Sequence, residues 1–172
     1  MKIIKLFLIL IAFISFTSCD DDDDDGTFSS NDLEGTWQLI FSEYEGTVKV
    51  MDEDSVIVET IQGKGRDFDF QTTYNDDGTF ESSGTYVIDE TTSIDNETTM
   101  ETIEAGSEGS SGEYTFDGTI ITLSNSFGVE SEFTVTTLTS NSLILQDITT
   151  SKDTLGSTII DTNGEFEVRY ER

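Results

Sequence analysis

Short segments in which apolar and polar residues alternate run through most of the chain. In the segment 35–42, GTWQLIFS, the side chains of Trp37, Leu39 and Phe41 fall on one side of an extended backbone. Alternation with a period of two residues is typical of a strand that buries one face. The sequence contains no proline, a residue that interrupts strands. We therefore expect a chain built from β-strands, without a helix of three turns.

Turn residues separate these segments at short intervals. The sequence NDDG at 75–78 predicts a hairpin connection. Asp117 and Gly118 predict a type I′ hairpin turn, which needs a positive φ at both residues, and Asn163 and Gly164 predict another turn. The regular spacing of turns indicates about eight to ten short strands.

The order of strands and turns predicts an all-β fold. A two-sheet sandwich and a closed barrel both suit this pattern, and the sequential hairpins favour an antiparallel up-and-down β-barrel. One polar, acidic stretch at 89–112 is longer than the usual loop. It is either a ragged strand near 98–103 or a mobile flap, and the pattern favours neither.

The first residues have the pattern of a secretory signal peptide. Lys2 and Lys5 form a short positive region, and the run 6–16 that follows is apolar and uncharged. At 1.5 Å per residue, this run is too short to cross a hydrocarbon core of about 30 Å. The segment 16–19, FTSC, resembles the lipobox of bacterial lipoproteins. The resemblance implies cleavage before Cys19 and a diacylglycerol on its thiol.

This N-terminus divides the chain into three parts. We expect a lipoprotein signal peptide at 1–18, a lipidated acidic tether at 19–34 and one β-barrel domain at 35–172. The lipid would anchor the protein in the outer membrane of a Gram-negative bacterium. Because Cys19 is the single cysteine, no thiol then remains for a disulfide.

Six aspartates, Asp20–Asp25, follow the cysteine directly. A block of like charge stays extended and solvated, so the tract predicts a spacer between lipid and domain. It also resembles the acidic stretch that directs some Gram-negative lipoproteins to the cell surface, which leaves the surface and the periplasmic side both open. Weak calcium binding by the tract is a further hypothesis, although the last ligand position of an EF-hand-type loop is Asp32 instead of glutamate.

The charge and composition exclude several function classes. The chain has 36 acidic and 8 basic residues and a formal net charge of −28, which excludes nucleic-acid binding because that binding needs basic residues against phosphates. It contains no histidine, so Ser-His and Cys-His pairs and imidazole metal sites are absent. The acids are too numerous for any pair to stand out as catalytic. We expect no enzyme, no metal site and no cofactor.

The first strand carries a family resemblance. LEGTWQLI at 33–40 resembles the Gly-x-Trp opening of lipocalins and of lipocalin-like domains on bacterial lipoproteins, and GEYTFDGTIITL at 112–123 is similar to a later hairpin of those domains. The resemblance implies that Trp37 closes the base of the barrel and that Arg169, on the last strand, lies across it. Such a stack is a cation–π contact worth about 0.5–2 kcal/mol.

An eight-stranded barrel is just wide enough to be filled by side chains or to hold one small ligand. Aromatic residues at expected inward positions are the candidates to line or fill it: Trp37, Phe41, Phe68, Phe70, Tyr86, Phe116, Phe133 and Phe166. Binding of a small apolar ligand is therefore one hypothesis. The alternative is an envelope interaction or structural lipoprotein that docks a protein or glycan through its loops.

Overall fold

A single turn of helix and eight antiparallel strands make up the described part of the chain. The computed structural model describes residues 28–52, 55–95, 97–155 and 158–172. In chain order the elements are α2 (Ser30–Leu33), β1 (Gly35–Asp52), β2 (Ser55–Tyr74), β3 (Thr79–Ile94), β4 (Glu97–Phe116), β5 (Ile120–Asn125), β6 (Glu130–Leu138), β7 (Ser142–Leu155) and β8 (Thr158–Glu171). Each strand pairs with the next and β8 pairs with β1, which closes the sheet. The predicted antiparallel up-and-down β-barrel is confirmed.

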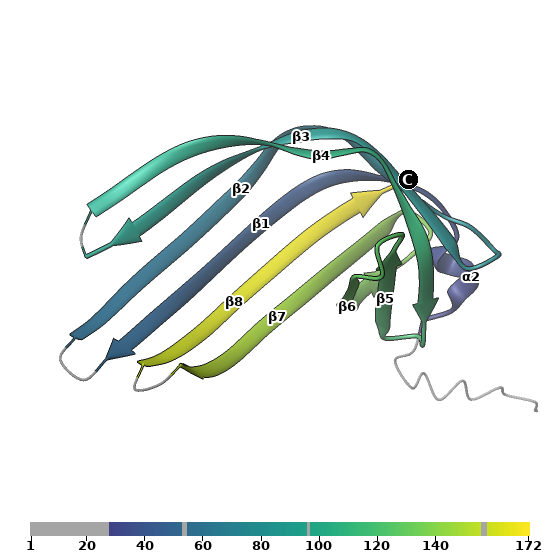
Figure 1. Cartoon of the computed structure of the whole chain (residues 1–172). Helices are drawn as coiled ribbons and strands as arrows, with labels where there is room; N and C mark the ends of the chain where they lie inside the picture. Colours follow the sequence, from purple (N-terminus) through teal and green to yellow (C-terminus); the bar gives the residue numbers. More distant parts are fainter. Residues whose placement is uncertain (1–27, 53–54, 96, 156–157) are drawn as a thin grey trace, which may run out of the picture.

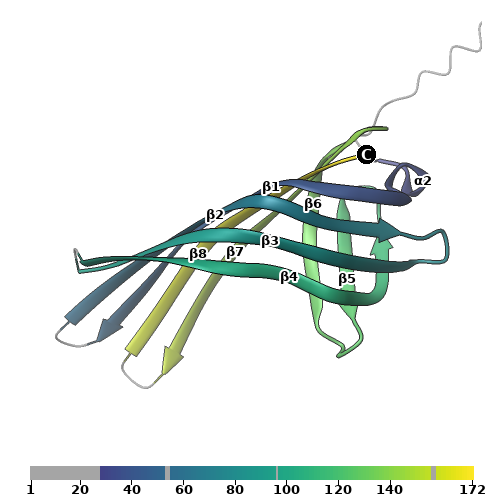
Figure 2. The ribbon, with the colours of Figure 1, turned by 90° about the horizontal axis from the view of Figure 1, so that it is seen from above.

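The strands differ greatly in length, which gives the barrel two unlike ends. β5 has 6 residues and β6 has 9, whereas the other strands have 14 to 20. At one end, which we call the closed end, all eight strands are present beside α2. At the other, the open end, the long strands continue past β5 and β6 as a curved sheet in the order β4-β3-β2-β1-β8-β7 (Figures 1 and 2).

Some strands run through segments for which the sequence predicted a turn or left the structure open. Asn163 and Gly164 form no turn, because both lie inside β8 and pair with Thr47 and Gly46 of β1. In the stretch 89–112, residues up to Ile94 belong to β3 and residues from Glu97 belong to β4, and the two arms pair with each other. In both places the backbone N–H and C=O groups form hydrogen bonds with a neighbouring strand. A local sequence pattern does not show which distant segment will pair in this way.

β-Bulges interrupt the ladders where the closed end meets the open end. The register shifts at three neighbouring places, which we call the bulge belt: Leu39–Phe41 in β1, Arg66–Asp69 in β2 and Ser82–Gly84 in β3. Inside the belt Asp67 has a φ of 53°. A bulge bends its strand and increases the local twist. The belt therefore marks the level at which the strands leave the closed barrel.

Two predicted hairpin turns have different outcomes. The turn at Asn75–Gly78 joins β2 to β3 as expected. The prediction of a type I′ turn at Asp117–Gly118, between β4 and β5, is wrong. Gly118 has a positive φ of 97°, but Asp117 does not. The carboxylate of Asp117 instead accepts hydrogen bonds from the N–H groups of Thr119 and Ile120, at 2.9 and 2.7 Å. These bonds hold a longer loop between β4 and β5.

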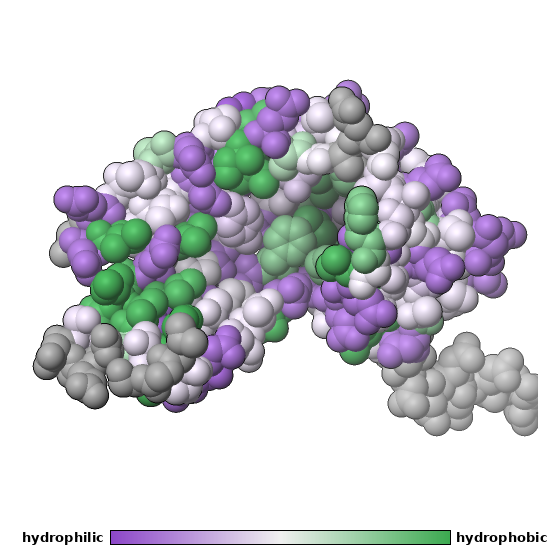
Figure 3. Space-filling model, viewed as in Figure 1, coloured by the Kyte–Doolittle hydropathy of each residue, from purple (hydrophilic) through white to green (hydrophobic). Residues whose placement is uncertain are grey.

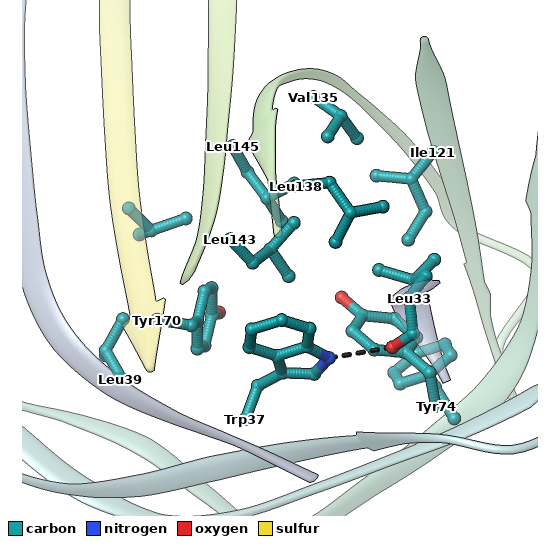
Figure 4. Close-up of a cluster of buried hydrophobic side chains, with 12 residues drawn as sticks. Leu33, Trp37, Leu39, Tyr74, Ile121, Val135, Leu138, Leu143, Leu145 and Tyr170 are labelled. Atoms are coloured by element: carbon teal, nitrogen blue, oxygen red, sulfur yellow. Dashed lines mark hydrogen bonds between the residues drawn. The ribbon is translucent and has the colours of Figure 1, made fainter. Parts of the chain in front are cut away.

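The strands turn polar side chains outward and apolar side chains inward. On β2, Gln62, Lys64 and Gln71 are exposed, whereas Thr72 and Tyr74 are buried. The most buried apolar side chains form one cluster at the closed end: Leu33, Trp37, Leu39, Tyr74, Phe80, Ile121, Val135, Leu138, Leu143, Leu145, Val168 and Tyr170 (Figure 4). The core therefore sits at the closed end.

The predicted signal peptide, the lipidation site Cys19 and the aspartates Asp20–Asp25 lie outside the described residues. The described part of the expected tether begins at Phe28, whose N–H donates to the carbonyl of Gly118 at 2.8 Å. Leu33 is fully buried. The folded domain therefore begins before the expected boundary at 35, and the chain enters it at the closed end.

Candidate ligand-binding site

The closed end is sealed around Trp37. This side chain is fully buried, and its indole Nε1 donates a hydrogen bond of 2.7 Å to the carbonyl of Leu33, at the end of α2. The Arg172 guanidinium carbon lies 4.0 Å from the centroid of the Trp37 ring and makes a cation–π contact. The same guanidinium donates to the carbonyls of Asp32 and Glu34. Figure 4 shows the bond between Trp37 and Leu33, and together these contacts hold α2 at the closed end as the floor of the barrel.

The arginine over Trp37 is thus Arg172, and the predicted pair of Trp37 with Arg169 is wrong. Arg169 lies on the outside of β8, with its guanidinium carbon 4.4 Å from the centroid of the Phe41 ring. Its Nε also donates to the carboxylate of Glu167 at 2.6 Å. Both arginines stack on a ring from β1, Arg172 at the barrel base and Arg169 on the outer wall.

A cavity of about 270 Å³ lies inside the barrel, above this floor. All eight strands contribute to its lining. Its walls carry seven aromatic residues, five aliphatic residues and five small polar ones: Phe70, Tyr74, Phe80, Tyr86, Phe133, Phe166, Tyr170; Leu39, Leu123, Val129, Leu145, Val168; and Thr72, Ser82, Ser110, Asn125, Ser131. None of these side chains is charged at neutral pH, so the cavity favours an uncharged ligand.

The cavity is lined by some of the aromatic residues that the sequence singled out: Phe70, Tyr86, Phe133 and Phe166. The ring of Tyr86 lies edge-on to that of Phe70 at 5.7 Å between centroids, and Phe133 lies 6.1 Å from Phe166. Offset and edge-to-face ring pairs of this kind are favourable and leave ring faces that a flat ligand can stack on.

Four other predicted residues lie elsewhere. Trp37 forms the floor below the cavity, and Phe116 packs against the core at the end of β4. Phe68 follows the bulge at Asp67 and packs against the core, 5.7 Å from the ring of Tyr86. Phe41 is on the outer wall, because the bulge after Leu39 shifts the alternation of β1 and turns Phe41 outward.

Most polar groups of the cavity are hydroxyls; the exception is the amide of Asn125, whose Oδ1 accepts hydrogen bonds from the N–H groups of Phe127 and Val129. The Oγ1 of Thr72 and the Oγ of Ser82 are 2.9 Å apart and buried. Burial raises the pKa of Tyr170 to about 12, an effect that a hydrogen bond with Thr72 opposes in part. Burial also raises the pKa of Tyr74. These phenols therefore stay neutral at physiological pH and offer hydroxyl groups without charge.

The cavity opens on the side of the barrel formed by the two short strands, β5 and β6. Asn125, Val129 and Ser131 line it from the β5–β6 hairpin, and Val129 is 58% exposed. In the space-filling view, apolar side chains are visible at the bottom of a hollow behind this hairpin (Figure 3). The cavity is thus open to solvent and not enclosed, because the short β5 and β6 leave this side of it uncovered.

A larger depression of about 610 Å³ lies on the outer face of the barrel. It crosses β1, β2, β3, β7 and β8 and is lined largely by charged and polar side chains such as Glu43, Lys64 and Glu165. A small apolar molecule would lose little contact with water there. The inner cavity is therefore the better candidate for an apolar ligand.

Several residues of this site were not among those predicted from the sequence, although strand alternation indicates them. Tyr74 lies on the inward side of β2 with Phe70, and Tyr170 lies on the inward side of β8. On β8 the exposed Arg169 comes between buried residues, whereas Arg172 lies at an even offset from Tyr170. Counting alternate positions from Tyr170 selects Arg172 as the arginine at the barrel base.

Comparisons with known proteins add little. No protein-family model matches the chain, and no curated protein matches it either. One solved structure that is similar is the crystal structure of Ail, the attachment invasion locus protein of Yersinia pestis. It shares 8% sequence identity, and the match covers 80% of this chain and 99% of that chain with a TM-score of 0.24. At that score the likeness says nothing about activity.

The described residues contain neither a membrane-spanning helix nor a cluster of metal-ligating side chains. None of their helices has the length and apolar character needed to span a bilayer. Among the same residues, no three His, Cys, Asp or Glu side chains gather in a way that could hold a metal ion.

Proposed function

We propose that this protein is a lipid-anchored, lipocalin-like barrel that binds one small, uncharged, ring-containing molecule in its central cavity, without catalysis. The observation that carries the proposal is the cavity of about 270 Å³, whose lining includes seven aromatic residues and which adjoins the buried core around Trp37. Ligand sites usually measure about 300–1,000 Å³. The cavity is slightly smaller, so its ligand would be a compact molecule of one or two rings.

The chemistry of the lining supports this ligand class. The rings offer flat apolar surface, and the hydroxyls of Thr72 and Ser82 offer weak polar contacts at one wall. A charged ligand would lose its hydration without gaining a counter-charge, because no lining residue is charged at neutral pH. Neutral aromatic or isoprenoid-like compounds fit these requirements.

The location of the domain entry supports an anchored arrangement. The expected lipid on Cys19 and the aspartate spacer precede Phe28, which is bound at the closed end. The entrance of the cavity lies on the side of the barrel away from the sealed floor, so an anchor at the closed end leaves it accessible. Outward side chains of β2 such as Gln62 and Lys64 are polar and exposed, which suits a wall in contact with water.

The anchor is tested by mass spectrometry of the protein from bacterial membranes. We expect a diacylglyceryl-modified N-terminal peptide beginning at Cys19, and release of the Cys19→Ser variant from the membrane fraction. An unmodified Cys19 in a membrane-bound protein would contradict the anchor.

The ligand class is tested by fluorescence titration with N-phenyl-1-naphthylamine, a neutral probe with three aromatic rings, and with the smaller 1-naphthol as competitor. The protein used begins at residue 20 and therefore carries no lipid. We expect saturable binding of at least one of the two compounds. Ser131→Trp should abolish it, because Ser131 lines the cavity at its exposed entrance.

Ser83→Trp is the matched control. Ser83 is exposed on β3 and is not among the cavity-lining residues, so the same new side chain there should leave binding unchanged. Equal binding by the wild type and by Ser131→Trp, or no binding of either compound by the folded wild type, would overturn the proposal.

A further inference from the structure

One long strand, β7, lacks a neighbour along much of one edge. β7 pairs with β8 from Ser142 to Leu155 but with β6 only from Leu143 to Gln146. Within the described chain, no other strand takes the place of β6 beside residues 147–155 (Figure 1). The backbone N–H and C=O groups of such an edge are a template for another extended segment.

A notch lies on the outer wall where β6 separates from β7. It measures about 240 Å³, and Ile120, Phe133 and Ile148 are among its lining residues. Ile148 is 69% exposed, so a large apolar side chain stands uncovered where the free edge begins. When an extended segment adds to a sheet edge, pockets beside the edge receive its alternate side chains. The notch is a pocket of this kind.

Acidic side chains outnumber basic ones along this edge, where Lys152 is the one basic residue of 147–155 and is paired across the ladder with Asp161. Glu165 is the direct cross-strand neighbour of Ile148 on β8, and Glu132 lines the notch from β6. The whole chain carries a formal net charge of −28. A second copy of this chain would be repelled, whereas a segment rich in lysine or arginine would be attracted.

The opposite edge, on β4, is a poorer template. β4 pairs with β5 only from Gly112 to Phe116, so its edge is also without a partner strand over most of its length in the described chain. However, its sequence at 105–112 is AGSEGSSG. Glycine weakens a strand and offers no side chain to pack. The β7 edge instead begins with Ile148, Thr149 and Thr150, whose branched side chains favour strand pairing.

We propose that the free edge of β7 binds an extended, basic segment of a partner protein by strand addition, with one apolar side chain of that segment in the notch at Ile148. The partner is recognised by alternation, with apolar and basic residues on the face that meets Ile148 and Glu165. This interaction uses the outer wall and stands whether or not the inner cavity binds a ligand.

The direct test uses synthetic peptides and the lipidated protein, which begins at Cys19, in phosphatidylcholine nanodiscs. The probe is a fluorescein-labelled peptide, KTITKTITK, whose lysines and isoleucines share one face of a strand. We expect it to bind at least about tenfold more tightly than ETITETITE, and more weakly as the salt concentration rises. KTIPKTIPK, in which prolines remove backbone donors, should not bind. Empty nanodiscs correct for binding to lipid.

Variants of the protein locate the site. Ile148→Lys places a positive charge in the notch and should reduce peptide affinity at least about tenfold. Ile40→Lys is the matched control, since Ile40 is 41% exposed on β1, away from the free edge. It should leave the affinity unchanged. Circular dichroism verifies that both variants remain folded.

Hydrogen exchange shows which edge is used. We expect the bound peptide to slow amide exchange at residues 147–154, with no change at 97–111. Equal affinity for all three peptides, protection of the β4 edge instead, or concentration-dependent dimers of the protein without peptide that protect 147–154 would each overturn the proposal.

Discussion

The two ends of this barrel use the same alternating sequence pattern with opposite results. At the closed end, inward side chains such as Trp37 and Leu143 are fully buried beneath a floor formed by α2. At the open end, Ile57 lies on the same face of β2 as the buried Gly63, yet it is 44% exposed, because β5 and β6 do not extend that far. The comparison indicates that stability resides in the closed end. The open end contributes long exposed strands and free edges, which are suited to contact with other molecules.

The largest expected effect tests whether the stability resides in the closed end. Trp37→Ala should lower the free energy of unfolding by about 3–5 kcal/mol, because it leaves a void in the core and removes the contacts of Leu33 and Arg172. Ile57→Ala, at the open end, should cost less than about 1 kcal/mol. Chemical denaturation of both variants measures the difference. Equal losses would show that the two ends share the stability evenly.

The bulge belt at the junction of the two ends provides the next test. A Cβ added at Gly84 would lie 1.9 Å from the carbonyl oxygen of Asp69, and Gly84 has a φ of 104°. We expect Gly84→Ala to cost about 2–4 kcal/mol, from backbone strain and from the clash.

Gly109→Ala is the control for Gly84→Ala. Gly109 has a φ of 91° but no atom within 4 Å of the added Cβ. Backbone strain alone should then cost about 1–2 kcal/mol. If the two variants unfold at the same denaturant concentration, the claim that the backbones of β2 and β3 approach closely at the bulge belt is contradicted.

Alkaline pH should weaken the closed end. Burial raises the pKa of Tyr170 from 10.0 to about 12, so the unfolded chain releases this proton first. The corresponding stability is present below pH 10 and is lost as the pH rises to 12, a loss of about 2–3 kcal/mol. Unfolding measured between pH 8 and pH 12 should show a shallower decline in Tyr170→Phe, and an unchanged decline in that variant would contradict the burial of this phenol.

The smallest effect separates the two stacked arginines. Arg172→Gln removes the cation–π contact with Trp37 and should cost about 0.5–2 kcal/mol. Arg169→Gln, on the outer wall, removes an exposed stack on Phe41 and a salt bridge to Glu167, and should cost at most about 1 kcal/mol. Thermal unfolding compares them. A larger loss for Arg169→Gln would favour the arginine that the sequence suggested.

The sequence predicted the architecture well because alternation and hairpin turns are local signals. It failed where a tertiary contact overrode them. Asn163 and Gly164 were predicted to form a turn, but they pair with β1 and lie inside β8. Phe41 was predicted to point inward, but a bulge turns it outward. No residue type at this position indicates the bulge. In the cavity, Phe70 and Tyr86 were identified from alternation, whereas the side entrance depends on the lengths of β5 and β6.

The central claim is that the inner cavity, and not the open end, binds a small neutral ligand. The most direct measurement is methyl NMR of the protein with bound 1-naphthol, read for nuclear Overhauser effects between ligand and methyl groups. The cavity predicts contacts to methyls of Leu123, Leu145 and Val168, and none to Val50 or Ile57 at the open end. Contacts confined to Val50 and Ile57, or no contact at ligand saturation, would contradict the claim.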